Sequence, residues 1–384
     1  MNKFLKLLFV FLFFIGFSYG VEFINFPDIA LVNDIEIDND TAWIATDNNL
    51  LKCKLDGSLI EKYSSESSIY FSSIKCIELD VNGYLWLGTL NGLACLDGLN
   101  VKFYTESDGL IFNWINDIAF DSQGQAWIGT EKGLSSFDGN TWTSYDTSNG
   151  LPHIGVKAVA IENDGTKWFG TYWGVSKFNN GVWTTYTVLD GLRYNDVNVV
   201  KIDNNSNLWF GCDVGGASVY DGTTWTNYSE EDGLGSSLRT SSIEADSTGN
   251  IWFGSDGGGL SKYDGSTWIT YKESDGLVNN HVRAISIDKY GNVWVGTWQG
   301  VSVLKNKTNA IHCKPSGNIA INKELHQTIK IYKLNGQLVS SKQFNKEKNA
   351  TFNREIGSGI FLVSIYTPID KNGNKTTIIK TIYK

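Results

Sequence analysis

The sequence is poor in methionine, proline and cysteine, and these shortages exclude several protein classes. Its 384 residues contain one Met, four Pro and five Cys, against 40 Gly, 14 Trp, 17 Tyr and 20 Phe. Aromatic residues favour strands and glycines favour tight turns, so we predict an all-β protein and not a helical bundle. The cysteines form no Cys-x-x-Cys pair or metal-site spacing, so we expect buried free thiols, no metal and no cofactor. A Cys76–Cys95 disulfide is the alternative.

Long apolar runs are also missing, apart from one at the start. Lys3 and Lys6 precede the run Leu7–Phe17, and Ser18–Gly20 supplies small residues for cleavage. This order is typical of a secretory signal peptide, to which we assign residues 1–20; an uncleaved anchor is the alternative. No later segment is apolar enough to span a bilayer, so we expect no transmembrane segment after cleavage.

Positive charge is scarce over most of the chain. Residues 21–306 carry 17 Lys and Arg against 37 Asp and Glu, whereas residues 307–384 carry 13 against 4. The change from a net charge of −20 to one of +9 predicts two domains with a boundary near residue 306. An acidic body of this size argues against nucleic acid as a partner.

The strongest signal is a repeat built on tryptophan. In seven copies, spaced 41–43 residues apart, a Trp precedes an apolar residue and then Gly or Ala: Trp43, Trp86, Trp127, Trp168, Trp209, Trp252 and Trp294. Around each Trp, four short strand patterns alternate with turns rich in Asp and Gly. Four antiparallel strands every 40–45 residues are the period of a propeller blade. We therefore predict a seven-bladed β-propeller over residues 21–306.

The two ends of this repeat predict how the ring closes. Six copies include a fourth strand, but the seventh stops at Leu304 without one. Phe23–Phe26 has the aromatic spacing of the missing strand. We expect residues 22–26 to be the outer strand of the seventh blade, which removes two exposed sheet edges. A disordered N-terminal tail is the alternative.

The repeat resembles a known family. Residues 85–93 (LWLGTLNGL), 126–134 (AWIGTEKGL) and 293–301 (VWVGTWQGV) are similar to the two-component regulator propeller repeat. In that family such propellers often form the periplasmic sensor part of hybrid histidine kinases, with glycans as the usual proposed ligands. The resemblance therefore implies a ligand-binding propeller. No kinase or receiver pattern follows it here, so we do not expect signalling within the same chain.

Residues 307–384 lose the tryptophan period but keep strand patterns. Residues 329–339 form a hairpin pattern with an Asn-Gly turn, and residues 357–365 and 376–383 alternate as strands, which predicts a small β-sandwich. These elements resemble the C-terminal sorting domain of type IX secretion cargo. That resemblance implies the type IX secretion machinery as a partner and export across the outer membrane to the cell surface or beyond. A plain adhesive or spacer sandwich is the alternative.

Candidate ligand-binding residues gather on one face of the predicted ring, where the loops between second and third strands meet the links between blades. Three of the four arginines lie in consecutive links: Arg193, Arg239 and Arg283. Arginine suits bidentate contact with carboxylate or sulfate. Local ion pairs with Asp190, Asp196 and Asp232 are the alternative.

Aromatic side chains occur in the same loops, where they can stack on sugars: Trp114, Tyr172, Trp173, Tyr194 and Trp298. Packing of the loops on one another is the alternative. The residue eleven positions before each Trp, from the second copy onward, is polar and is predicted to lie at the mouth of the central channel. These residues are Lys75, Asn116, Lys157, Asn198, Ser241 and Arg283.

The sequence thus favours a secreted or cell-surface, monomeric and non-catalytic binding protein. Its favoured ligand is a polysaccharide or oligosaccharide, and an acidic one fits the arginines. We find no Gly-x-Ser-x-Gly, His-Glu-x-x-His or phosphate-loop motif and predict no catalytic residues. A carbohydrate-active lyase or hydrolase, for instance with His153 or His281 as a base, and a protein-interaction scaffold are the alternatives.

Overall fold

A computed structural model describes residues 22–306, except residues 30, 65–72, 99 and 236–237, and four strands between residues 327 and 383. The chain divides into two compact units, Met1–Asn306 and Lys307–Lys384. The predicted signal peptide, Cys313 and Arg354 lie outside the described residues.

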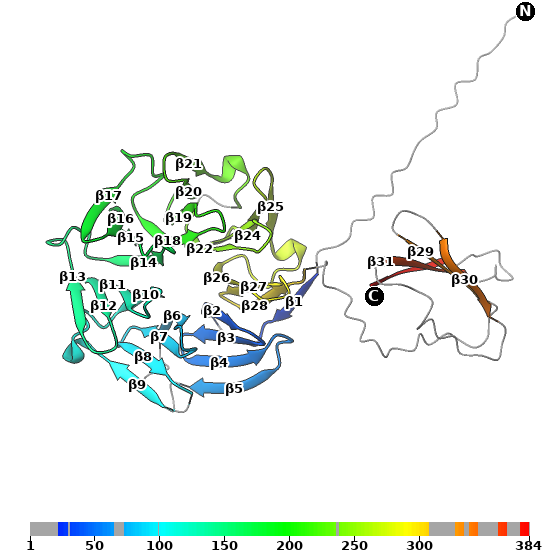
Figure 1. Cartoon of the computed structure of the whole chain (residues 1–384), viewed down its shortest axis with the longest axis horizontal. Helices are drawn as coiled ribbons and strands as arrows, with labels where there is room; N and C mark the ends of the chain where they lie inside the picture. Colours follow the sequence, from blue (N-terminus) through cyan, green and yellow to red (C-terminus); the bar gives the residue numbers. More distant parts are fainter. Residues whose placement is uncertain are drawn as a thin grey trace, which may run out of the picture. The chain divides into compact units, whose positions relative to one another are not determined.

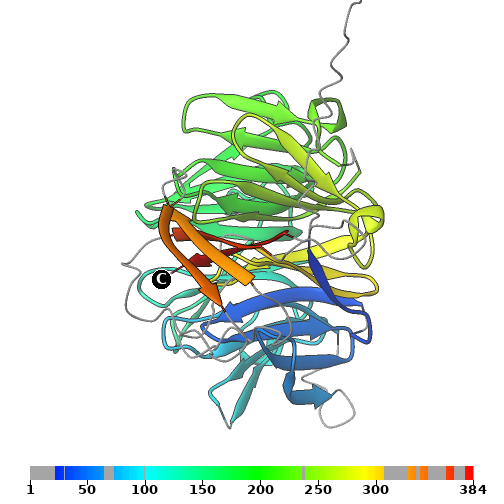
Figure 2. The ribbon, with the colours of Figure 1, turned by 90° about the vertical axis from the view of Figure 1, so that its right-hand side faces the viewer.

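The first unit is a seven-bladed β-propeller, which confirms the predicted fold (Figures 1 and 2). Each blade is a four-stranded antiparallel sheet. The innermost strands surround the central channel: β2 (Val32–Asp38), β6 (Ile74–Leu79), β10 (Ile115–Phe120), β14 (Val156–Ile161), β18 (Val197–Ile202), β22 (Thr240–Ala245) and β26 (Val282–Ile287). The second strands contain the repeated Trp: β3 (Thr41–Thr46), β7 (Leu85–Thr89), β11 (Ala126–Thr130), β15 (Lys167–Thr171), β19 (Leu208–Cys212), β23 (Ile251–Ser255) and β27 (Val293–Thr297).

The two outer strands complete each blade. The third strands are β4 (Asn49–Lys54), β8 (Leu93–Leu96), β12 (Gly133–Phe137), β16 (Gly174–Asn179), β20 (Ala217–Tyr220), β24 (Gly259–Tyr263) and β28 (Gly300–Leu304). The outermost strands are β5 (Leu59–Ser64), β9 (Val101–Tyr104), β13 (Trp142–Tyr145), β17 (Val182–Tyr186), β21 (Trp225–Tyr228), β25 (Trp268–Tyr271) and β1 (Phe23–Phe26). Three links between blades contain a 3-10 turn: η2 (Glu106–Asp108), η3 (Glu230–Asp232) and η4 (Glu273–Asp275).

The ring closes as the sequence predicts. Strand β1 pairs antiparallel with β28, so that Phe23 faces Leu304 and Phe26 faces Val301. Phe26 also stacks on Trp294 of the same blade, with ring centroids 6.3 Å apart. The first and the last strand of the propeller therefore belong to one sheet, and neither leaves an open edge there.

Most of the core lies between neighbouring blades. Trp127 of the third blade packs in one cluster with Val159 and Phe169 of the fourth. The Gly two residues after six of the seven Trp makes this approach possible. A Cβ at Gly211 would lie 2.4 Å from Cγ1 of Val199 and 2.7 Å from Cγ2 of Thr240 on the next blade's innermost strand.

The repeated Asp before each Trp organises a turn. Nε1 of Trp209 donates a hydrogen bond to Oδ2 of Asp203 (3.0 Å), whose Oδ1 accepts from the backbone N–H groups of Asn205 and Asn207. The same Asp–Trp bond recurs at Trp86, Trp127, Trp252 and Trp294. This repeated carboxylate therefore stabilises the hairpin between the first two strands of the blade.

Four cysteines lie in the propeller, and all four are buried free thiols: Cys53, Cys76, Cys95 and Cys212. This confirms the expectation for the described cysteines, and the Cys76–Cys95 disulfide is wrong.

The second unit contains one antiparallel sheet of four strands: β29 (Gln327–Lys333), β30 (Leu338–Phe344), β31 (Ile360–Tyr366) and β32 (Thr377–Tyr383). Their order in the sheet is β30-β29-β31-β32. The β-sandwich stays a prediction.

Candidate functional site: a cationic cavity at the channel mouth

Every innermost strand contains a β-bulge at the same position. The register of its pairing with the second strand shifts by one residue there in all seven blades. A bulge turns the side chain of its extra residue out of the regular pleat. These extra residues, which we call the channel mouth, are Asn33, Lys75, Asn116, Lys157, Asn198, Ser241 and Arg283. All seven line a single cavity of about 400 Å³.

Counting back from each Trp found six of these seven residues. It missed Asn33, which lies ten and not eleven positions before Trp43. The reason is the first hairpin: Asp38 pairs directly with Thr41. The turn of this blade is therefore one residue shorter than the others. Counting from the bulge and not from the Trp would have found Asn33.

The cavity brings together seven of the ten predicted ligand-binding residues: Lys75, Lys157, Arg239, Arg283, Trp114, Tyr172 and Trp298. The other three do not line it. Nε of Arg193 donates to the carbonyl of Gly215 (2.8 Å), which fixes a neighbouring loop. Trp173, 64% exposed, packs against the ring of His153, and Tyr194 is exposed outside the cavity.

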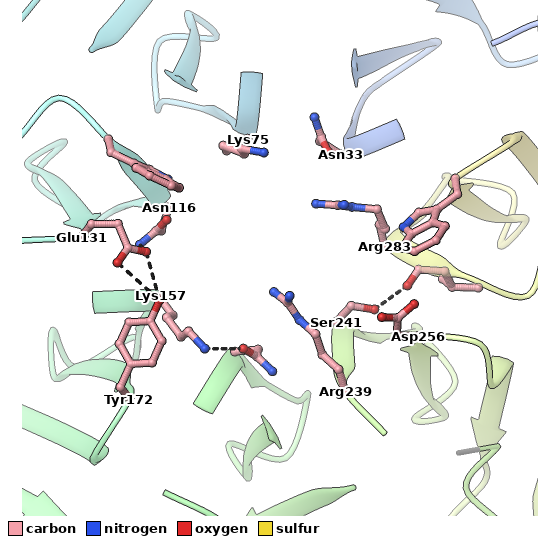
Figure 3. A pocket seen from close by; sticks show the side chains of 14 residues that line it. Asn33, Lys75, Asn116, Glu131, Lys157, Tyr172, Arg239, Ser241, Asp256 and Arg283 are labelled. Carbon is pink, nitrogen blue, oxygen red and sulfur yellow. Dashed lines mark hydrogen bonds between the residues drawn. The ribbon is translucent and has the colours of Figure 1, made fainter. Parts of the chain in front are cut away.

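Three cations converge in one part of the cavity. Figure 3 shows the side chains of Lys75, Arg239 and Arg283, which we call the cation cluster, pointing towards its centre. Burial lowers the pKa of Lys75, and the positive charges of Arg283 and Arg239 add to this effect. The pKa of Arg283 is lowered by burial and by Arg239. Within the described residues, Lys75 and Arg283 form no ion pair, and Arg239 is 4.0 Å from Asp213.

The arginines do not pair with the acids considered from the sequence. Oδ2 of Asp190 accepts from the backbone of Thr187, and Oδ2 of Asp232 accepts from that of Ser229. Asp196 forms an ion pair with Lys157. These three acids are therefore committed elsewhere. The carboxylates that act on the cation cluster are Asp213, 4.0 Å from Arg239, and Asp47 and Asp256, whose charges partly offset the lowering of the Arg283 pKa.

In the other part of the cavity, around Lys157 and Tyr172, the polar side chains form hydrogen bonds and ion pairs with one another. Nζ of Lys157, which pairs with Asp196, also donates to Oδ1 of Asn198 (2.8 Å) and lies 4.1 Å from the centre of the Tyr172 ring. The hydroxyl of Tyr172 donates to Glu131 (3.3 Å), and burial together with Glu131 raises the pKa of Tyr172 to about 12. Figure 3 shows this network opposite the cation cluster.

Two further polar features lie at the cavity wall: the amide of Asn33 and the pair formed by Asp256 and His281. Nδ2 of Asn33 donates to Oδ1 of Asp47 and to the carbonyl of Ile74. Its buried Oδ1, however, accepts no hydrogen bond from the residues that the structure describes. At the rim, Asp256 contacts Nδ1 of His281, whose ring stacks on Trp298 with centroids 4.1 Å apart.

Further along the innermost strands, carboxyl groups interact across the ring. Burial raises the pKa of Asp34 to about 6 and that of Asp117 to about 7. Burial and the charge of Asp34 raise the pKa of Glu36 to about 8. Lys201 and Glu244 form an ion pair among them (2.6 Å). The channel is therefore cationic at its mouth and acidic along its length.

Two absences hold for the part of the chain that the structure describes. No three His, Cys, Asp or Glu side chains lie close enough together to hold a metal ion. No helix there has the length and hydropathy needed to cross a membrane.

Comparison with known proteins identifies the repeat and the fold. Residues 109–132 and 276–299 match the family model for the two component regulator propeller. No curated protein matches the chain. Many solved structures share the fold.

Three solved structures illustrate this likeness. One is the extracellular domain of the protein named hybrid two component system BT3049 from B. thetaiotaomicron, with 18% identity and a TM-score of 0.66 over 94% of this chain and 57% of that one. The chain thus spans little more than half the length of that protein. PorZ of Porphyromonas gingivalis, called an essential surface component of the type-IX secretion system, is 15% identical (TM-score 0.61; 92% and 60% covered).

The third is virginiamycin B lyase from Staphylococcus aureus, which is 15% identical with a TM-score of 0.59, over 74% of this chain and 99% of that chain. At these identities the likeness establishes the fold and not the activity. The chain is therefore a seven-bladed propeller in which two stretches match the two component regulator propeller repeat.

Proposed function

We propose that this propeller binds the anionic group of an acidic polysaccharide or oligosaccharide in the cavity at its channel mouth. The observation that carries the proposal is the cation cluster. Lys75, Arg239 and Arg283 repel one another, and burial removes part of the water that would screen Lys75 and Arg283, whereas Arg239 is exposed. A carboxylate or sulfate placed between them relieves this repulsion and accepts charge-assisted hydrogen bonds.

The cavity wall favours a sugar as the carrier of that anion. Trp114 and Trp298 line the cavity and remain partly exposed, so their rings are available to stack on the apolar face of a pyranose. A cavity of about 400 Å³ is in the size range of small-molecule sites and suits one or two sugar residues better than a folded protein partner.

We further propose that the protein acts at the cell surface or outside the cell, after export by type IX secretion. The N-terminal signal pattern and the C-terminal strands at residues 329–339 and 357–365 motivate this proposal. The likeness to an extracellular domain and to a surface component of that secretion system supports it.

The thermal stability of the purified full chain against a panel of glycans tests the binding proposal. Uronate-containing and sulfated oligosaccharides are expected to raise the melting temperature, whereas neutral ones are not. At a hundred times its dissociation constant, a ligand stabilises the folded state by about 2.7 kcal/mol. Arg283→Ala and Lys75→Ala should abolish the shift.

Arg193→Ala is the matched control, because this arginine lies on the same face but outside the cavity. It should leave the ligand-induced shift intact. A shift that is lost equally in Arg193→Ala and Arg283→Ala would contradict the assignment of the site. Stabilisation by no glycan at all would favour the protein-interaction scaffold instead.

A further inference from the structure

A histidine–carboxylate pair lies at the rim of the cavity. Nδ1 of His281 contacts Oδ1 of Asp256, and Asp256 itself lines the cavity. The imidazole ring is nearly parallel to that of Trp298, with an interplanar angle of 9°. The backbone of His281 is fixed as well, because its N–H donates to Asn279 and its carbonyl accepts from Trp298. The ring is therefore oriented by three neighbours, yet the side chain remains 37% exposed.

This arrangement leaves one ring nitrogen free to accept a proton. The carboxylate of Asp256 accepts from Nδ1, so the neutral ring carries its proton there and its lone pair on Nε2. His153 differs in this respect. Its Nδ1 accepts a hydrogen bond from the N–H of Gly155 (2.9 Å), and its ring packs against Tyr172 and Trp173. Of these two histidines, His281 has the orientation of a general base.

His281 does not itself line the cavity but contacts Asp256 and Trp298, which do, and Asp256 connects it to the cation cluster. The N–H of Asp256 donates to the carbonyl of Arg239 (2.9 Å), and the charge of Asp256 acts on Arg283, two residues along the chain from His281. A carboxylate held by the cluster loses much of its negative charge. The C–H bond next to a neutralised carboxylate becomes more acidic, which is the condition for its removal by an imidazole.

We propose that this site cleaves uronate-containing polysaccharides by β-elimination, an inference that rests on the proposed binding of an acidic glycan. Nε2 of His281 takes the proton from the carbon next to the carboxylate. The electron pair of that C–H bond forms a double bond to the neighbouring ring carbon, and the glycosidic C–O bond at that carbon breaks. The imidazolium returns the proton to the departing oxygen, directly or through water. The products are one unsaturated uronate end and one free hydroxyl, with no net oxidation.

The carboxylates of the cavity fit elimination better than hydrolysis. Among the described residues that line it, two carry a carboxyl group, Glu131 and Asp256. Glu131 accepts hydrogen bonds from Asn116 and Tyr172, and Asp256 holds His281. A glycoside hydrolase usually needs one carboxyl group free to act as an acid and another free as a base or nucleophile.

Ultraviolet absorbance of the conjugated double bond tests the proposal directly. The purified full chain is incubated with polygalacturonate, alginate and hyaluronan, with dextran as the neutral control. At least one uronate polymer should produce an absorbance rise that dextran does not. His281→Ala should lower kcat by about 10²–10⁴-fold, the usual contribution of a general base. Asp256→Asn should lower kcat with little change in KM, because Asp256 is a positioning residue.

His153→Ala is the matched control and should keep full activity. Melting temperatures with and without polymer separate the two proposals. A polymer that stabilises the chain through Arg283 but yields no unsaturated product overturns the elimination and leaves the binding proposal intact. New reducing ends without absorbance, or full activity in His281→Ala, also overturn it. If no uronate polymer binds, the elimination proposal fails, and the binding proposal is then decided by the sulfated oligosaccharides.

Discussion

Arg283 is largely buried in a cavity that Arg239 of the neighbouring blade also lines, and both burial and the charge of Arg239 lower the pKa of Arg283. Two like charges are thus kept together in one cavity, with a single long ion pair, from Arg239 to Asp213 at 4.0 Å, among the described contacts of the two arginines with carboxylates. Such an arrangement is costly for the empty protein and favourable for an anion-bound one. It is the structural basis of the binding proposal, and it has a consequence for the protein without ligand.

Removing one charge of the cluster should stabilise the empty propeller. Arg283→Met keeps much of the apolar stem but relieves the repulsion with Arg239 and Lys75. We expect the free energy of unfolding to rise by about 0.5–1 kcal/mol without ligand. Urea denaturation of the two proteins at low salt measures this difference. A variant less stable than the parent would mean that Arg283 has a stabilising partner within the fold.

The acidic channel predicts that stability falls as the pH rises. The pKa values of Asp34, Asp117 and Glu36, about 6, 7 and 8, lie above the values near 4 expected in the unfolded chain. The folded state therefore binds more protons above pH 4, so the stability that this gives is complete below about pH 4, declines as the pH rises and is lost once the groups ionise in the folded state at about pH 6 to 8. Burial lowers the pKa of Lys201 but the charge of Glu244 and its hydrogen bond raise it by more, so Lys201 stays protonated throughout this pH range and does not alter the trend.

Melting temperatures measured from pH 5 to pH 8.5 test this. They should fall with pH in the parent protein and fall less in Glu36→Gln, which cannot ionise. A curve that rises towards pH 8.5 would show that the channel carboxyl groups ionise more easily than their burial suggests.

The closing strand should contribute measurably to stability. Phe26 packs in the cluster between the first and seventh blades and stacks on Trp294. Phe26→Ala should lower the free energy of unfolding by about 2–3 kcal/mol, somewhat less than a fully buried Phe. Ile24, on the same strand but exposed, is the control. Equal losses in Phe26→Ala and Ile24→Ala would argue against a packing role for β1.

Replacing the glycine of the repeat by a larger residue should destabilise the propeller where two neighbouring blades are in close contact. Gly211→Ala places a Cβ within 2.4 Å of Val199 and 2.7 Å of Thr240. We expect a loss of about 1–3 kcal/mol, as for other overpacked cores. The first blade has Ala45 at the equivalent position, paired with Asp34. Ala45→Gly should therefore cost less than Gly211→Ala, and thermal unfolding of the two variants decides between them.

The blades were predictable because each is a local unit, whereas the site was predictable only in part. The Trp period fixes the seven sheets, and in six of them the Trp binds an Asp or Glu six residues before it. The presence of an arginine in a link between blades was a weaker predictor of a cavity residue than the Trp period was of a blade. Arg283 is the bulge residue and Arg239 lies two residues before Ser241, but Arg193 lies five residues before Asn198, too far along the chain to reach the cavity.

The pair His281–Asp256 could not be predicted at all. These residues are 25 positions apart and come from different loops, which only the packing of the sixth and seventh blades brings together. No spacing rule of the repeat connects them. The burial of the acidic residues in the channel could not be predicted from the sequence either. An acid in a strand of alternating polar and apolar residues is expected to face solvent, and only the closed ring buries it.

The pairing of β1 with β28 also bears on how the molecule is made. Oγ of Ser302 donates to Oδ1 of Asn25, and these residues are 277 positions apart. The seventh blade therefore cannot be completed until nearly the whole propeller sequence has emerged from the ribosome. Contacts of such long range are slow to form. The open ring, with an unpaired edge at each end, is thus the species that must be kept from aggregating on the way to the folded protein.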